Sequence, residues 1–192
     1  MPEDDMADLG AAKALANPLR QRILRELELL GEATSTTLAA RLGVTTGGTS
    51  YNLRILAEHG FVEEVPERAR GKERWWRSAR RSVRFEPRGA QEPAMRDAVD
   101  LLAEVWFGED KELLARLDEV RDQLGPWAAA RPFSRGVITV DLDELMAFFT
   151  DYLALLKRYQ RPHGQAAPGA RTVHTRFVAF PDPEEGATGR HD

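Results

Sequence analysis

The stretch TTLAARLGVTTGGTSYNLRILAEHG, residues 36–60, decides the fold. It holds two short helical patterns. Leu38 and Leu42 lie one turn apart in the first, which Gly43 can end. In the second, Thr45 is a suitable cap, Gly60 closes the helix, and one face carries Thr49, Leu53 and Leu56 at spacings of four and three. Two short helices joined by the tight turn 43–45 predict a helix-turn-helix.

The helix before this stretch begins at Asn17-Pro18. Asn is a good N-cap, and Pro is favoured at the first helical position because its missing N–H would be unpaired there. Gly31 supplies a stop, and Thr34 or Ser35 can cap the next helix. A short helix rich in Ala and Leu is predicted over residues 7–16. The apolar residues that follow Pro18 at helical spacing are Leu19, Ile23, Leu24, Leu27 and Leu30.

After Gly60 the pattern changes from helix to strand. FVEEV (61–65) ends at Pro66, ERARGK (67–72) is polar and contains a glycine, and ERWWR (73–77) follows. We expect two short antiparallel strands around the loop 67–72. A hairpin that follows a helix-turn-helix forms a wing, so a winged helix-turn-helix is predicted.

The net charge of −4 is unevenly distributed. Residues 1–90 carry 15 Lys and Arg against 13 Asp and Glu, which leaves 12 and 18 for residues 91–192. Residues 66–88 hold three acidic side chains and nine basic ones, a pattern typical of a phosphate-binding surface or of a solvated one. The basic residues are Arg68, Arg70, Lys72, Arg74, Arg77, Arg80, Arg81, Arg84 and Arg88.

The second half of the chain is predicted to be mainly helical. Apolar stripes run through residues 91–124, and Asp141 and Glu144 form a capping box for a helix that ends near Tyr159. VITV (137–140) and the run at 171–180 are predicted strands that pair with each other. The expected fold class is therefore mainly α with a small β part. The expected division is a winged helix-turn-helix domain at 1–88 and a helical region at 89–192, with a disordered tail from about 181.

Composition excludes several classes of function. The chain has no Cys, and its four His show no metal-ligand spacing, so no metal and no other cofactor are expected. Catalytic residues are not predicted either, because phosphate-binding loops, nucleophile elbows and zinc-protease signatures are absent from the sequence. With neither a membrane span nor a signal peptide, a cytoplasmic protein without membrane contact is expected.

Several of these features occur in the order found in one known family. They are the A-N-P-x-R helix start, the L-A-x-x-L-G turn, the T-S-Y-x-L-R-x-L helix and the G-F-V strand. Over about residues 8–80 the chain resembles the winged helix-turn-helix domain of ArsR-type bacterial transcription regulators. The second half is similar to the extensions of longer family members. The resemblance implies a DNA-binding transcription regulator, most often a repressor, whose second helix of the motif reads DNA.

Helix geometry and the resemblance together select the candidate DNA-binding residues. The recognition helix (about 45–59) directs one face to the major groove, and the wing (about 61–77) reaches the DNA backbone or the minor groove. Gly47 and Gly48 allow close backbone approach, whereas Asn52 points sideways and Arg54 is suited to phosphate. The candidates are Thr45, Thr46, Gly47, Gly48, Ser50, Tyr51, Asn52, Arg54, Arg68, Arg70 and Lys72.

One recognition helix makes too few base contacts for operator-level affinity, so a homodimer on a palindromic operator in double-stranded DNA is expected. The stripes in 91–124 and the helix at 7–16 form the predicted interface, unless they pack within one chain. The aromatic residues of the second half fill a core or line a pocket for a small-molecule or peptide effector. The alternative function is a winged helix that contacts protein and does not bind specific DNA.

Overall fold

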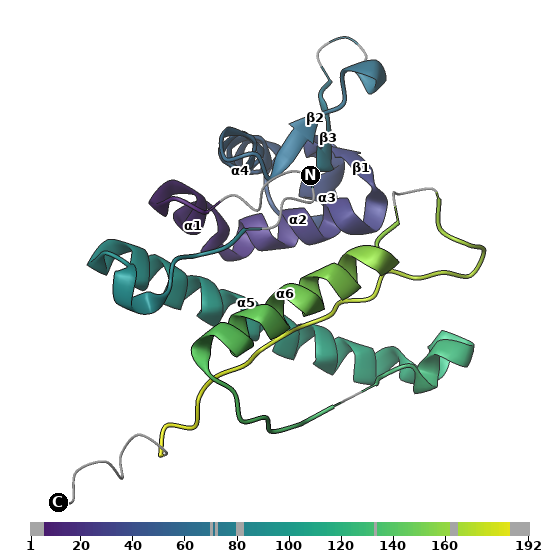
Figure 1. The fold of residues 1–192 in the computed structure, drawn as a ribbon. Helices are drawn as coiled ribbons and strands as arrows, with labels where there is room; N and C mark the ends of the chain where they lie inside the picture. Colours follow the sequence, from purple (N-terminus) through teal and green to yellow (C-terminus); the bar gives the residue numbers. More distant parts are fainter. Residues whose placement is uncertain are drawn as a thin grey trace, which may run out of the picture. The chain divides into compact units, whose positions relative to one another are not determined.

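The computed structural model describes most of the 192 residues, namely 6–69, 71, 73–79, 83–132, 134–161 and 165–184. The chain forms two compact units, Met1–Pro132 and Phe133–Asp192 (Figure 1). The first unit holds the helices α1 (Leu9–Leu15), α2 (Pro18–Leu30), α3 (Ser35–Leu42), α4 (Thr46–Glu58) and α5 (Pro93–Val120) and the strands β1 (Glu32–Thr34), β2 (Val62–Glu64) and β3 (Trp75–Ser78). Short 3₁₀ helices η1, η2 and η3 span Pro66–Arg68, Arg88–Ala90 and Arg121–Ala129.

The predicted N-terminal starts of α2, α3 and α4 are confirmed by their capping hydrogen bonds. Asn17 Oδ1 accepts from the Arg20 N–H at 3.1 Å, Thr34 Oγ1 from Thr37 N–H at 3.1 Å, and Thr45 Oγ1 from Gly48 N–H at 3.1 Å. Each cap pairs one of the N–H groups that the first helical turn leaves without a partner. These three capping residues therefore determine where α2, α3 and α4 begin.

A single core joins α1, α2, α3 and α4 with the sheet and the first half of α5. The predicted inward face of α4 is confirmed, because Thr49, Leu53 and Leu56 are fully buried. From α2 and α5 the core receives, among others, Ile23, Leu27 and Leu102. This packing fixes the phase of α4, and so it determines which of its side chains reach the surface.

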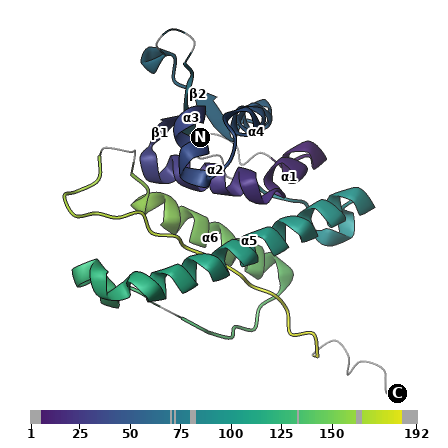
Figure 2. The ribbon, with the colours of Figure 1, turned by 180° about the vertical axis from the view of Figure 1, so that it is seen from behind.

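The sheet has the order β1-β3-β2, with both pairs antiparallel. Figure 1 labels all three strands, and Figure 2 labels β1 and β2 as seen from behind. Ala33 of β1 lies opposite Trp76 of β3, and Trp76 also lies opposite Glu64 of β2. The predicted hairpin β2–β3 is confirmed. The third strand, β1, was not predicted, and it makes β3 the central strand.

Helix α5 packs against α1 through its first half. Ala98 and Leu102 are its buried residues, while α1 buries Ala11, Ala12, Ala14 and Leu15. The first compact unit therefore extends to Pro132, past the predicted boundary at residue 88. This packing occupies α1 and the start of the 91–124 stripe within one chain, so that part of the predicted dimer interface is not free.

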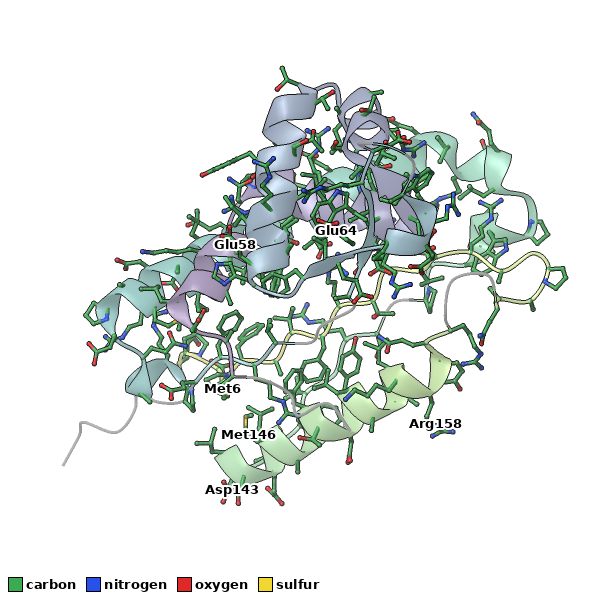
Figure 3. The ribbon with its side chains drawn as sticks, turned by 90° about the horizontal axis from the view of Figure 1, so that it is seen from above. Met6, Glu58, Glu64, Asp143, Met146 and Arg158 are labelled. Carbon is green, nitrogen blue, oxygen red and sulfur yellow. The ribbon has the colours of Figure 1, made fainter. Side chains whose placement is uncertain are left out.

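The second unit contains α6 (Leu142–Tyr159) and the segment that follows it. The predicted capping box is confirmed, since Asp141 and Glu144 exchange side chain-to-backbone hydrogen bonds of 2.8 and 2.9 Å. Acidic residues in the first turn, such as Asp143, and basic ones in the last, such as Arg158, match the helix dipole (Figure 3).

The strands predicted at 137–140 and 171–180 are not formed in the described residues, so this prediction is wrong. Val137 is 96% exposed and Val173 60%, so neither run has an apolar layer to cover. Instead, the Phe177 ring lies against α6, with centroids 5.3 Å from Phe149 and 4.8 Å from Tyr152. The run 171–180 thus contacts α6 through the aromatic ring of Phe177 and does not form a strand ladder in the described residues.

Candidate nucleic-acid interface

The connection between α3 and α4 is a tight turn. Gly43 adopts a left-handed conformation with φ of 68°, which favours glycine, and the Val44 N–H donates to the Ala39 carbonyl at 3.1 Å. Thr45 then caps α4. The turn holds the two helices in contact, with α4 as the second helix of the motif.

The outward face of α4 is polar and accessible. Thr45, Thr46, Tyr51 and Arg54 are exposed, and Ser50 is half-buried. Tyr51 is the most prominent of the large side chains, with 62% of its surface exposed. Within the part of the chain that the structure describes, Arg54 forms no ion pair, so its guanidinium is available to an anion.

The first turn of α4 contains two glycines that differ in their surroundings. A Cβ placed on Gly47 would meet no atom within 4 Å, whereas one on Gly48 would lie 3.1 Å from Thr45 Oγ1, the capping atom. Gly47 is exposed and Gly48 half-buried. Gly47 therefore leaves open space in front of the helix N-terminus, where N–H groups and the helix dipole favour an anion.

Asn52 lies apart from the other candidates, because it is buried. Its Nδ2 donates to the Gly48 carbonyl at 2.9 Å, and its Oδ1 accepts from an Arg20 guanidinium N–H at 3.2 Å. The side chain is thus engaged inside the domain and does not belong to the exposed face. The sequence placed Asn52 sideways on the helix but did not identify its partner Arg20.

The wing brings together arginines and carboxylates. Arg74 pairs with Glu64 at 2.7 Å, and Arg77 with Glu63 at 2.6 Å, which raises the pKa of Arg77. Arg68 η1-nitrogen lies 3.2 Å from a Glu32 oxygen, and its guanidinium stacks 4.2 Å from the Trp75 ring centroid. Figure 3 labels Glu64 on β2.

This pairing offsets much of the positive charge that the sequence places in the stretch 66–88. Three of its arginines meet carboxylates on β1, β2 and η1, and Arg88 binds Asp100 of α5 with two hydrogen bonds of 2.5 and 2.9 Å. The described part of the stretch is therefore a charge-paired surface rather than an uncompensated cationic stripe. The candidates Arg70 and Lys72 lie outside the described residues.

The described ranges hold neither a metal-binding cluster nor a membrane-spanning helix. No group of three or more His, Asp and Glu side chains is arranged to hold a metal ion. No helix among these residues is long and apolar enough to cross a membrane.

The helices α2, α3 and α4 and the hairpin β2–β3 define a winged helix-turn-helix. In agreement, residues 15–65 match the model of a helix-turn-helix domain family. A solved structure of fragment 1–100 of a possible transcriptional regulatory protein from Mycobacterium bovis is 30% identical, with 51% of this chain and 85% of that one covered. Its TM-score is 0.33, too low to support a statement about the fold. Among curated proteins, none matches the chain. The chain thus contains a helix-turn-helix domain at its N-terminal end.

Proposed function

We propose that the protein is a sequence-specific DNA-binding transcription regulator. The observation that carries this proposal is the outward face of α4, which is polar and accessible and whose Arg54 forms no ion pair with any residue that the structure describes. A helix of 13 residues is about 20 Å long, and a helix of this kind fits the major groove, where base edges present their donors and acceptors. No enzymatic role is proposed.

The side chains of α4 divide by the groups they can contact. Thr46 and Ser50 can donate to or accept from base edges, and Tyr51 adds a phenol that reaches further from the helix. Arg54, one turn beyond Ser50, is placed to bind backbone phosphate. The helix N-terminus at Gly47 offers a second phosphate contact.

Contacts from the wing supplement those of α4 in this proposal. The ion pairs of Arg68, Arg74 and Arg77 are at the surface, where solvent screens such pairs and they stabilise little. A phosphate can therefore replace a carboxylate at small cost. Arg70 and Lys72 at the wing tip are proposed to contact the same backbone.

The finer assignment is an ArsR-type repressor that acts as a homodimer on a palindromic operator. Its support is the motif resemblance and the outer side of α5 between Leu101 and Leu114, where large apolar side chains remain accessible. Leu101 is 49% exposed, Trp106 40%, Phe107 58% and Leu114 43%. A second copy of the chain is the proposed cover for this surface. A small-molecule or peptide effector is proposed to act through the region 89–192.

One observation favours the alternative, a winged helix that contacts protein. The charge-paired wing has less excess positive charge than a phosphate-binding surface usually carries. The two functions differ in their response to salt. Each phosphate contact contributes roughly −0.9 to the slope of log K against log salt concentration on duplex DNA.

The test measures binding to duplex DNA between low and physiological salt for the wild type, Tyr51→Ala and Arg54→Ala. The proposal expects a linear salt dependence, weaker binding in both variants, and a slope shallower by about 0.9 in Arg54→Ala. Binding that neither variant changes would contradict the chosen face. Light scattering on the purified protein tests the dimer, and a single species near the 21.5 kDa of one chain would refute it.

A further inference from the structure

Arg20 of α2 makes three hydrogen bonds that reach two other helices. Its Nε donates to the Ala14 carbonyl, and one terminal nitrogen donates to the Lys13 carbonyl at 2.8 Å, so both bonds hold the C-terminal end of α1. The other terminal nitrogen donates to Asn52 Oδ1 of α4 at 3.2 Å. Burial lowers the pKa of Arg20, and the nearby Tyr51 opposes that shift.

Asn52 continues this connection into the first turn of α4. Its amide orientation follows from its two partners, because only the oxygen can accept from a guanidinium and only the nitrogen can donate to the Gly48 carbonyl. The path therefore runs from the end of α1 through Arg20 and Asn52 to Gly48. Gly48 also binds the capping Thr45 through its N–H.

The path joins two parts of the fold that have different roles. α1 packs against α5, whereas the first turn of α4 presents Thr46 and Gly47 at the surface. That turn contains two adjacent glycines, which lose more conformational freedom on ordering than other residues do. Side-chain hydrogen bonds to such a turn restrict its motion and keep it in the conformation that the structure shows.

We propose that the Arg20–Asn52 bridge is a positioning device that holds the first turn of α4 against α1 and so increases DNA affinity without contacting DNA. The proposal makes two claims. The claim that the bridge increases DNA affinity rests on the proposed DNA binding, whereas the claim that it orders the first turn of α4 concerns the protein alone. Arg20 and Asn52 are thus positioning residues, and the groups that touch DNA are those of the exposed face.

The test compares the full chain with Arg20→Met, Asn52→Leu and the double variant, with Arg96→Met as the matched control. Arg96 also donates from Nε to a backbone carbonyl, that of Gln91 at 2.9 Å, but it belongs to α5. The first readout is amide hydrogen exchange in the free protein. Exchange at Gly48 and Thr49 is expected to rise about fivefold or more relative to Leu56 in all three bridge variants, and not in the control.

The second readout is the dissociation constant for duplex DNA under conditions where every variant stays folded. Each single variant is expected to bind about five- to tenfold more weakly, and the double variant no more weakly than the weaker single one, because one bridge is lost in each case. The salt slope is expected to stay as in the wild type. A slope reduced by about 0.9 would make Arg20 a phosphate contact and overturn the proposal.

The two readouts separate the two hypotheses. If the wild type binds no DNA, the proposed function fails and hydrogen exchange alone decides the bridge. If the variants are less stable but their α4 turn exchanges as in the wild type, Arg20 is merely structural and the inference is wrong. Should Arg20→Met not fold, Asn52→Leu gives the same decision, because it removes the bridge and leaves both α1 bonds of Arg20 in place.

Discussion

Replacement of Gly47 by Ala is expected to make the protein more stable and its DNA binding weaker. Gly47 has a helical conformation, and the added Cβ meets no atom within 4 Å, so no strain offsets the gain. A glycine replaced under these conditions restricts the unfolded chain and stabilises the fold by about 0.4–1 kcal/mol. The same methyl group stands in the space through which a DNA backbone would approach α4.

The loss of affinity follows from packing at that contact. An extra methyl group forced into a close-packed contact costs about 1–3 kcal/mol, which corresponds to a dissociation constant about 5- to 150-fold higher. Urea unfolding measures the gain in stability, and titration of fluorescent duplex DNA measures the loss of affinity. A single substitution that moves these two quantities in opposite directions cannot act through misfolding.

Two glycine variants serve as controls. Gly89→Ala also places a methyl group in open space, but outside α4, so it should stabilise the protein and leave DNA binding unchanged. Gly48→Ala presses on the capping oxygen of Thr45, so its stability gain should be smaller or absent. The reasoning is refuted if Gly47→Ala is more stable and still binds DNA as tightly as the wild type.

Three further predictions concern charged groups. Glu63→Gln removes the nearer of the two carboxylates that pair with Arg77 and leaves Glu67 at 3.9 Å, so DNA affinity should rise and the salt slope steepen; an unchanged slope in the same titration would show that this arginine never meets phosphate. Arg41→Ala removes the 2.5 Å partner of the buried Glu26 and should cost about 1–3 kcal/mol in urea unfolding, and a cost within 0.5 kcal/mol would contradict this. The Arg88 guanidinium, through its hydrogen bonds, lowers the pKa of Asp100, so the pair stabilises the fold above about pH 4 and that stabilisation is lost as the pH falls further. Asp100→Asn should therefore flatten the loss of stability in acid, and an equally steep loss in both proteins would argue against the pair.

Local patterns in the sequence predicted the helices of the DNA-binding half well. Asn17-Pro18, Thr34 and Thr45 act on neighbours within one turn, so their capping bonds depend on nothing distant. The phase of α4 follows from the spacing of Thr49, Leu53 and Leu56. Those signals were sufficient to place Tyr51 and Arg54 at the surface.

Features that depend on distant partners were not visible in the sequence. β1 is only three residues long, too short to show alternation, and it forms because β3 offers it a free edge. The Arg77–Glu63 ion pair of the wing depends on strand register, which sets these two residues opposite each other. Arg20 and Asn52 are 32 residues apart, and no local pattern connects them.

The most direct test of the central claim is selection of genomic DNA fragments by the purified protein at about 150 mM salt, a concentration that screens nonspecific phosphate binding. Wild type and Tyr51→Ala are compared in parallel. The account predicts that the wild type enriches one palindromic motif, with half-sites about one helical turn apart, and that Tyr51→Ala loses this enrichment. Fragments bound without a shared motif, or a motif that Tyr51→Ala enriches equally well, would contradict sequence reading by α4.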